Sequence, residues 1–300
     1  MFDILIIGSG PSGMTSAIYG ARMNLKVLVI EKGAPGGAMV NTFNIENYPG
    51  FASISGATLS MNMFNQMTEL GVEFVSDEVE KIEKTKDYFT VKTTYSTYLS
   101  KTVILATGTK NRKLEVKGEE EFIGRGISFC AICDGSFYKN KDVMVVGGGN
   151  AAIEEALYLS NIAKKVYLVH RRSEFRADNL SVSKLKEKEN VEFILSHTIK
   201  EFSGDKKLEK VLLLNLKDNS EKWMDINGVF IYIGQLPNSD LVKDLGITNE
   251  SGYVIVDSNF ETKVKGLFAS GDVIEKGVRQ IATAINDGAI SALSASRYIK

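Results

Sequence analysis

The chain has 300 residues, of which 44% are hydrophobic and 24% charged, and its formal net charge is −1. This balance is typical of a globular protein of about two domains, and it excludes the strongly basic surface that nucleic-acid binding requires. No apolar run approaches the roughly 18 residues that span a bilayer, and the start Met1-Phe2-Asp3 lacks the basic residues of a secretory signal. We therefore expect a cytoplasmic protein that binds neither nucleic acid nor membrane.

The chain begins with a strand, a glycine turn and a helix. The apolar run 4–7 predicts a buried strand, the glycine-rich turn 8–13 follows it, and residues 12–23 have helical spacing. A second strand at 26–30 ends at Glu31. In such a unit the turn and the helix N-terminus bind a pyrophosphate, and the acid binds ribose hydroxyls. This first site therefore suits FAD or NAD, whereas Glu31 would repel a 2′-phosphate.

The same pattern recurs from Asp142 onward. A strand at 142–146 precedes the glycine turn 147–152, a helix is expected at 150–160, and a second strand at 166–169.

The second copy lacks an acid at the position of Glu31. It reads His170-Arg171-Arg172 there, with Arg176 one helical turn beyond. Arginine binds phosphate oxygens through charge-assisted hydrogen bonds of about 1.5–3 kcal/mol each. The second site should therefore prefer NADPH to NADH, with His170 as a neutral polar contact; the alternative is a solvated basic strand end.

Cys130 and Cys133 are the only cysteines of the chain. A structural disulfide across so short a loop would gain only about 2 kcal/mol, against about 4.7 kcal/mol for a loop of 100 residues. A zinc site would need two further ligands, and the only histidines, His170 and His197, lie far along the chain. Disulfides in a reducing cytosol are usually catalytic or redox-sensing, so we expect a redox-active pair, with the structural and metal roles as alternatives.

The C-terminal tail predicts a return to the first unit. Residues 266–272 are typical of a short strand that ends in a glycine turn, and residues 283–299 form an Ala-rich helical pattern. Our hypothesis is that the tail folds back onto the N-terminal unit, which leaves the second unit inserted. The polar stretches 110–113 and 235–239 are then candidate hinges.

Together these motifs resemble those of the low-molecular-weight bacterial thioredoxin reductases, in the class II pyridine nucleotide-disulfide oxidoreductase family, over essentially the whole chain. Residues 36–37 and 45–50 resemble the flavin-ring loop of that family, and residues 103–108 resemble the segment that crosses beside FAD. Three residues depart from the family pattern. Ala38 replaces the usual Gln against the flavin, Tyr48 replaces the Trp of some members, and Ile132 replaces the common Thr.

The resemblance implies an α/β fold of two Rossmann-like (FAD/NAD(P)-binding, three-layer ββα) domains, the second inserted into the first. The FAD-binding domain would comprise residues 1–113 and 241–300, and the NADPH-binding domain residues 114–240 with the Cys pair. The FAD contacts that it implies are Gly8, Ser9, Gly10, Pro11, Ser12, Gly13, Glu31, Lys32, Gly37, Ala38, Asn47, Ala106, Thr107, Gly108, Gly271, Asp272, Arg279, Gln280 and Ile281. The NADPH contacts that it implies are Gly147, Gly149, Asn150, Ala151, His170, Arg171, Arg172 and Arg176. No metal is expected.

The resemblance also implies a reaction. NADPH passes hydride to FAD, reduced FAD reduces the Cys130–Cys133 disulfide, and the dithiol reduces thioredoxin (thioredoxin-disulfide reductase, EC 1.8.1.9). In the family the second cysteine faces the flavin and the first attacks the partner, which assigns these roles to Cys133 and Cys130. Asp134 is placed to act as acid or base, and a capping role in the turn is its alternative. Family members are homodimers, and their inserted domain moves between two arrangements.

Three alternatives stay open on the sequence. One is a flavin-dependent disulfide reductase that uses another electron donor, such as reduced ferredoxin; the arginine cluster argues against it and the departure at Ala38 keeps it open. Another is the reductase part of a peroxide-detoxifying system, although such proteins usually carry an additional N-terminal region. The last is a redox sensor that binds NADPH without turnover.

Overall fold

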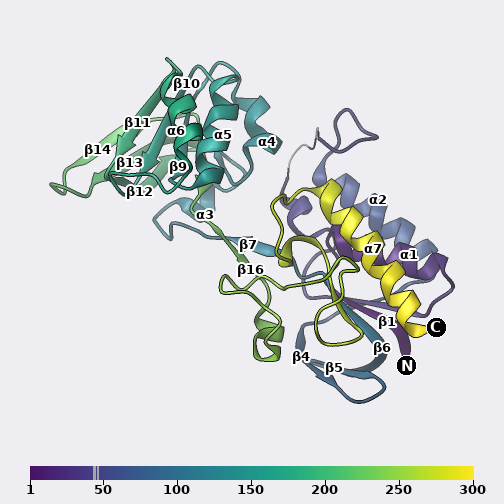
Figure 1. Cartoon of the computed structure of the whole chain (residues 1–300). Helices are drawn as coiled ribbons and strands as arrows, with labels where there is room; N and C mark the ends of the chain where they lie inside the picture. The colour runs from purple at the N-terminus through teal and green to yellow at the C-terminus, as the bar shows by residue number, and fades with distance from the viewer. Residues whose placement is uncertain (43–44, 46) are drawn as a thin grey trace. The chain divides into compact units, whose positions relative to one another are not determined.

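The computed structural model describes residues 1–42, 45 and 47–300, so Glu46 of the expected flavin-ring loop lies outside the described residues. The chain forms two compact units (Figure 1). Unit 1 comprises Met1–Lys110 and Leu236–Lys300, and unit 2 comprises Asn111–Gln235. In the described part of the chain, no helix has the length and apolar character required to cross a membrane.

Unit 1 is built on a mixed sheet with the strand order β3-β2-β1-β6-β5-β4, in which β17 also pairs with β6. The strands β1, β2, β3, β6 and β17 are parallel to their neighbours in this set, whereas β4 and β5 form an antiparallel extension. The elements of unit 1 are β1 (Phe2–Ile7), α1 (Pro11–Arg22), β2 (Val27–Glu31), η1 (Gly37–Asn41), α2 (Gly56–Glu69), β3 (Glu73–Ser76), β4 (Val79–Lys84), β5 (Phe89–Thr93), β6 (Thr97–Leu105), η3 (Asp240–Leu245), β17 (Leu267–Ala269), η4 (Gly271–Val273) and α7 (Ile281–Ile299).

The first strand is apolar throughout because both faces of the sheet are covered. Ile4 and Ile6 pack into one core with α1, α2 and α7, which lie together on one side of the sheet in Figure 1. Leu5 and Ile7 point the other way, into a second core under the antiparallel strands and the C-terminal loops. A strand buried on both sides reads as a continuous apolar run instead of an alternating one.

The C-terminal tail completes unit 1, as the tail hypothesis expects. Strand β17 pairs with β6 through Leu267↔Val103 and the two following residues, and α7 packs along α1. The Ser16 hydroxyl donates to the Gly288 carbonyl at 3.0 Å, which joins the two helices inside the core. Unit 1 is therefore made of chain segments from both ends of the sequence.

Unit 2 repeats the design with a parallel sheet in the order β11-β10-β9-β15-β8 and an antiparallel β12-β13-β14 meander. Its elements are α3 (Glu119–Phe122), β8 (Ile127–Ser128), α4 (Ala131–Asp134), η2 (Gly135–Tyr138), β9 (Asp142–Gly147), α5 (Asn150–Ser160), β10 (Lys165–His170), α6 (Asn179–Lys186), β11 (Val191–Leu195), β12 (His197–Gly204), β13 (Leu208–Asn215), β14 (Glu221–Asp225) and β15 (Gly228–Tyr232).

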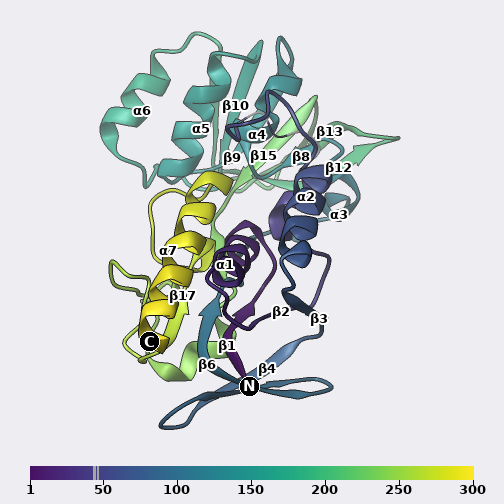
Figure 2. The same ribbon diagram turned by 90° about the vertical axis from the view of Figure 1, so that its right-hand side faces the viewer.

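The central strand β9 is again buried on both faces. Val143 and Val145 join a core with the helices α5 and α6, and Met144 and Val146 join one with the strands β12 and β13. Figure 2 shows α5 and α6 on one side of this sheet and β12 and β13 on the other. The two chain segments that link the units pair with each other as β7 (Thr109–Asn111) and β16 (Gln235–Pro237).

Candidate functional site: a dithiol turn and two glycine loops

The two cysteines form a disulfide in a one-turn helix of unit 2, with Cα atoms 5.3 Å apart. The turn is held by local hydrogen bonds: the Cys133 amide donates to Cys130 Sγ at 3.2 Å, and the Cys130 amide donates to Ser128 Oγ at 3.1 Å. The Ala131 amide donates to the Tyr232 hydroxyl at 2.5 Å. Of the two side chains between the cysteines, Ala131 is buried and Ile132 is 42% exposed, so the turn presents one apolar residue at the surface.

Asp134 lies directly after the disulfide, in a partly enclosed position. Its carboxylate accepts a hydrogen bond of 2.6 Å from the Ser128 hydroxyl, and burial raises the pKa of this carboxyl despite that bond. A carboxyl whose pKa is raised holds a proton closer to neutral pH than an ordinary aspartate does, which suits a group that exchanges protons with thiols.

The first glycine loop connects β1 to α1 in unit 1. Gly8 has a φ of +102°, and a Cβ there would lie 2.4 Å from the Ala106 carbonyl oxygen; a Cβ on Gly13 would lie 1.9 Å from the Gly8 oxygen. These two glycines therefore fold the loop tightly. A Cβ on Gly10 would meet nothing within 4 Å among the described residues, so this side of the loop is open to a bound group.

Glu31, at the end of β2, is tied to this loop. Its Oε2 accepts from the Ser9 amide at 2.8 Å and from the Ser9 hydroxyl at 3.1 Å, and its Oε1 accepts from the Gly33 amide at 2.8 Å. Pro11 is the first residue of α1, and in the described residues no side chain caps this helix. Its N-terminal amides are therefore available to an anion.

One further predicted stretch of unit 1 meets the same loop, and a second meets the C-terminal segment. The Gly36 amide donates to the Ser9 carbonyl at 2.9 Å, and a Cβ on Gly37 would lie 3.1 Å from the Gly10 Cα. The Asn47 side chain donates from Nδ2 to Gln280 Oε1 at 3.0 Å, which brings together residues from opposite ends of the chain. The side chains of Lys32 and Ala38 are exposed.

The segment Ala106, Thr107 and Gly108 follows β6 beside the loop. Ala106 donates from its amide to the Ile7 carbonyl at 2.8 Å, and Thr107 exchanges two hydrogen bonds with Asn238, at 2.7 and 2.9 Å. This segment is therefore fixed by β1 on one side and by the returning chain on the other.

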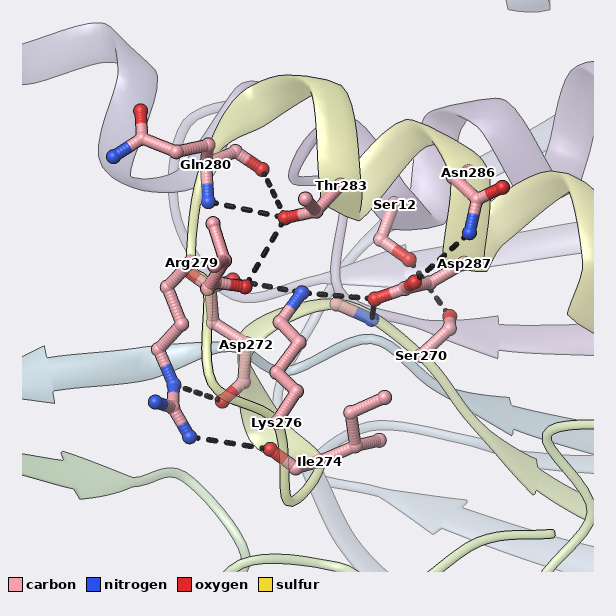
Figure 3. Close-up of polar contacts among 12 residues, drawn as sticks. Ser12, Ser270, Asp272, Ile274, Lys276, Arg279, Gln280, Thr283, Asn286 and Asp287 are labelled. Atoms are coloured by element: carbon pink, nitrogen blue, oxygen red, sulfur yellow. Dashed lines mark hydrogen bonds and ion pairs between the residues drawn. The ribbon is translucent and has the colours of Figure 1, made fainter. Parts of the chain in front are cut away.

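The C-terminal segment approaches the loop from another side (Figure 3). The Ser12 hydroxyl donates to Ser270 Oγ at 2.7 Å, and Lys276 forms ion pairs with Asp272 at 3.3 Å and with Asp287 at 2.8 Å. Burial raises the pKa of the Asp272 carboxyl, and the Lys276 charge opposes the shift.

Figure 3 also shows how the start of α7 is fixed. Arg279 donates from its guanidinium to the carbonyls of Asp272 and Ile274, each at 3.3 Å. Gln280 caps α7, and its backbone amide donates to Thr283 Oγ1 at 3.1 Å. Ile281 is the first residue of that helix. Of the predicted residues of unit 1, Glu31, Gly37, Ala106 and Gly271 approach the first glycine loop directly, each from a different stretch of sequence.

The second glycine loop connects β9 to α5 in unit 2. A Cβ on Gly148 would lie 2.2 Å from Cε1 of His170, so the imidazole packs directly on this glycine. A Cβ on Gly149 would meet nothing within 4 Å among the described residues, as at Gly10 in unit 1. Asn150 and Ala151 begin α5 with exposed side chains.

The arginine segment lies against this loop. The Arg176 amide donates to the Gly148 carbonyl at 2.8 Å. Burial and the neighbouring arginine charges lower the pKa of His170, so its ring is neutral at pH 7. A hollow of about 440 Å³ opens at this segment, lined by Arg171, Arg172, Ser173, Glu174, Phe175, Arg176, Ser196, Leu216 and Lys217.

A family model described as pyridine nucleotide-disulphide oxidoreductase matches residues 2–288. The chain belongs to this family. The thioredoxin reductases of Listeria innocua and of Bacillus subtilis are each 44% identical to it over 301 residues, covering 100% of this chain and 94% and 95% of theirs. The crystal structure of thioredoxin reductase from Streptococcus pyogenes superimposes with a TM-score of 0.93 at 47% identity, covering 99% of this chain and 98% of that one.

These findings confirm the resemblance and the fold class that the sequence predicts. Membership of the pyridine nucleotide-disulphide oxidoreductase family implies a flavin and a pyridine nucleotide as electron carriers. The residues present fit such groups, because each unit has a glycine loop with an open side and a helix start that no side chain caps in the described residues.

Three residues near the dithiol turn were not predicted from the sequence: Ser128, Glu155 and Tyr232. Ser128 and Tyr232 bond to the dithiol turn itself, and Glu155 lies on α5 beside the Tyr232 hydroxyl. Only Ser128 is near the cysteines in sequence. Tyr232 is separated from Ala131 by 101 residues, and the apolar pattern of β15 gives no sign that the phenol of its last residue turns toward the dithiol.

Proposed function

We propose that the chain is an NADPH-dependent, FAD-containing thioredoxin-disulfide reductase whose Cys130–Cys133 pair reduces thioredoxin. The observation that carries the proposal is that the disulfide-bonded pair and the arginine-lined hollow belong to the same unit. At the equivalent strand end, the other unit has a carboxylate instead. The names of its relatives support the choice of thioredoxin as substrate.

Each glycine loop is assigned one nucleotide. In unit 1, Glu31 would hold the adenosine ribose of FAD, and the uncapped start of α1 would face the pyrophosphate. In unit 2, Arg171, Arg172 and Arg176 would hold the 2′-phosphate of NADPH. A bound FAD would supply two-electron transfer between the nicotinamide and the disulfide.

The cysteines carry the exchange with the partner. The bound nucleotides would supply the two electrons that break the Cys130–Cys133 bond. Uptake of one proton then gives a Cys133 thiol and a Cys130 thiolate. The Cys130 thiolate then attacks the partner disulfide, forming a mixed disulfide and releasing one partner sulfur as a thiolate. The Cys133 thiol loses its proton to the released partner thiolate. The Cys133 thiolate then attacks Cys130 Sγ, which restores the internal disulfide and releases the second partner sulfur as a thiolate.

Asp134 supplies the proton-transfer group. Its carboxyl pKa is raised by burial, so it can hold a proton near the sulfurs and give it to a leaving thiolate.

From the family resemblance we also propose a homodimer, which sedimentation of the purified protein would test.

The test is a spectrum of the purified protein followed by anaerobic addition of one nucleotide. We expect flavin absorbance that NADPH bleaches markedly faster than NADH does, and NADPH-dependent reduction of thioredoxin. The variant Cys133→Ser should bind flavin and still bleach, but it should not reduce thioredoxin. A colourless protein, or a flavoprotein that NADPH does not reduce, would contradict the proposal, and bleaching without turnover on thioredoxin would favour the redox sensor.

A further inference from the structure

The Ala131 amide, between the two cysteines, depends on a distant side chain. Ala131 is fully buried, so its N–H cannot reach water. The first amides of a helical turn have no partner within the turn itself, and this one donates to the Tyr232 hydroxyl at 2.5 Å. Tyr232 is the last residue of β15 and follows Ala131 by 101 residues in the sequence.

Tyr232 also borders the second glycine loop. In the parallel pairing of β15 with β9 it stands opposite Gly147, and a Cβ on Gly147 would lie 2.4 Å from the Tyr232 carbonyl oxygen. The residue is therefore fixed by its backbone beside the loop, while its hydroxyl holds the dithiol turn.

A third group orients this hydroxyl. A phenol has one proton to donate, and because Tyr232 accepts from Ala131 its own proton is free for another acceptor. The Glu155 carboxyl on α5 and the Tyr232 phenol each shift the pKa of the other, which makes this carboxyl the acceptor that we assign to that proton. Tyr232 thus interacts with both the Ala131 amide and a carboxyl of α5.

We propose that Tyr232 is a positioning residue for the dithiol, with Glu155 orienting its hydroxyl. This inference rests on the proposed function, and it adds two residues to the machinery of the same reaction. The anchor matters most in the reduced state. While the disulfide is closed, the covalent ring restrains Ala131; once it opens, the turn depends on its hydrogen bonds to keep the two sulfurs close. An anchored turn loses less conformational entropy when the disulfide closes again.

The environment of Glu155 agrees with this role. Burial raises the pKa of Glu155 to about 7, the Glu154 charge adds to the shift, and the Tyr232 hydrogen bond opposes it. Its Oε2 is buried without a hydrogen-bond partner in the described part of the chain. Burial, together with the charges of Glu155 and Asp134, raises the pKa of Tyr232, so the phenol keeps its proton.

The test is the equilibrium between dithiol and disulfide in the purified flavoprotein. The protein is equilibrated with defined ratios of reduced and oxidised dithiothreitol, free thiols are alkylated, and the two forms are counted by mass. We expect Tyr232→Phe to lower the equilibrium constant for disulfide closure about threefold to tenfold, the effect of one hydrogen bond. Glu155→Leu should lower it by a smaller factor, and Glu155→Gln, which keeps an acceptor, should stay within about twofold of wild type.

Tyr167→Phe, on β10, is the matched control and should not change the constant. A constant for Tyr232→Phe equal to that of this control would overturn the inference. If Tyr232→Phe does not fold, Glu155→Leu decides, and a wild-type value for it has the same force. A wild-type pair that cannot be reduced and reoxidised at all would instead count against the proposed function.

Discussion

The two units share one strand–loop–helix design but differ in the residue at the end of the next strand. Both place a glycine loop after a strand buried on two faces, and in both one glycine has an open side, Gly10 in unit 1 and Gly149 in unit 2. At the end of the next strand they differ. Unit 1 has Glu31, whose carboxylate binds the loop through Ser9, whereas unit 2 has His170, whose neutral ring packs on Gly148.

The difference separates the part of a nucleotide site that the fold dictates from the part that chooses the ligand. The loop and the helix start serve any pyrophosphate, so they recur in both units. The strand end faces the ribose, and there a carboxylate accepts hydroxyl protons while arginines attract a phosphate. Four predictions follow, from the largest expected effect to the smallest; the first three test this division and the last concerns Glu155.

The tight side and the open side of the unit 1 loop should respond differently to a methyl group. Gly13→Ala puts a Cβ 1.9 Å from a backbone oxygen, so we expect it to lower the free energy of unfolding by about 1–3 kcal/mol and to abolish flavin binding. Gly10→Ala should leave unfolding nearly unchanged and weaken only flavin binding. Denaturant titration and the flavin content of the purified variants measure both. A Gly10→Ala protein with wild-type flavin affinity would show that no pyrophosphate approaches that side.

The arginines of unit 2 should set the nucleotide preference. Replacing Arg171 and Arg172 together by Ala removes charge-assisted bonds worth about 1.5–3 kcal/mol each, so the preference for NADPH over NADH should fall at least tenfold. The measurement is kcat/KM for each nucleotide, with flavin content expected to stay constant. Arg125→Ala, an exposed arginine of the same unit away from the hollow, is the control. An unchanged preference in the double variant would remove the 2′-phosphate from this hollow.

The sequence predicted the parts of both sites that follow from local rules. The helix at 150–160 is found as α5 with the same bounds, and the expected strands around both glycine loops are found within one or two residues. Apolar runs and glycine spacing act over a few residues, so one chain segment is enough to read them. The antiparallel strands β12–β14 were not predicted, because their buried residues follow neither a strict alternation nor one continuous apolar run.

Contacts between distant segments were out of reach. Nothing in the sequence indicates that Asn47 meets Gln280 or that Tyr232 bonds Ala131, because each pair depends on the completed packing of a whole unit. Which individual residues contact each cofactor stays a prediction.

The carboxylate of unit 1 should matter for flavin affinity. Glu31→Gln keeps one oxygen acceptor toward Ser9 but removes the charge, so we expect flavin to bind about tenfold more weakly, the effect of weakening one charge-assisted bond. Equilibrium dialysis of the apoprotein against FAD measures it. The exposed Glu80→Gln is the control. Equal affinities for both variants would exclude Glu31 from the ribose site.

Glu155 should make the stability of unit 2 depend on pH. Because the pKa of Glu155 is raised to about 7 in the folded protein, the folded state binds the proton more tightly than the unfolded chain, and the resulting stability is present below the unfolded pKa and lost as pH rises through 7. Glu155→Gln should remove this slope, a change on the order of 1 kcal/mol after screening of a partly exposed group. Denaturant titrations at pH 5 and pH 8 measure it; parallel pH profiles for variant and wild type would contradict the shift.

The strand β6 pairs with β1, β5 and β17, and this has a consequence for how the protein is made on the ribosome. The inserted unit is continuous in sequence, so it can acquire its complete core while the last 65 residues of the chain are still to be translated. The N-terminal unit must wait, because Phe268, Ala292 and Ala295 fill its core. Unit 2 should therefore fold before unit 1 during synthesis. In ribosome-bound chains that expose residues up to 240, unit 2 should resist protease, whereas residues 1–110 should be cleaved.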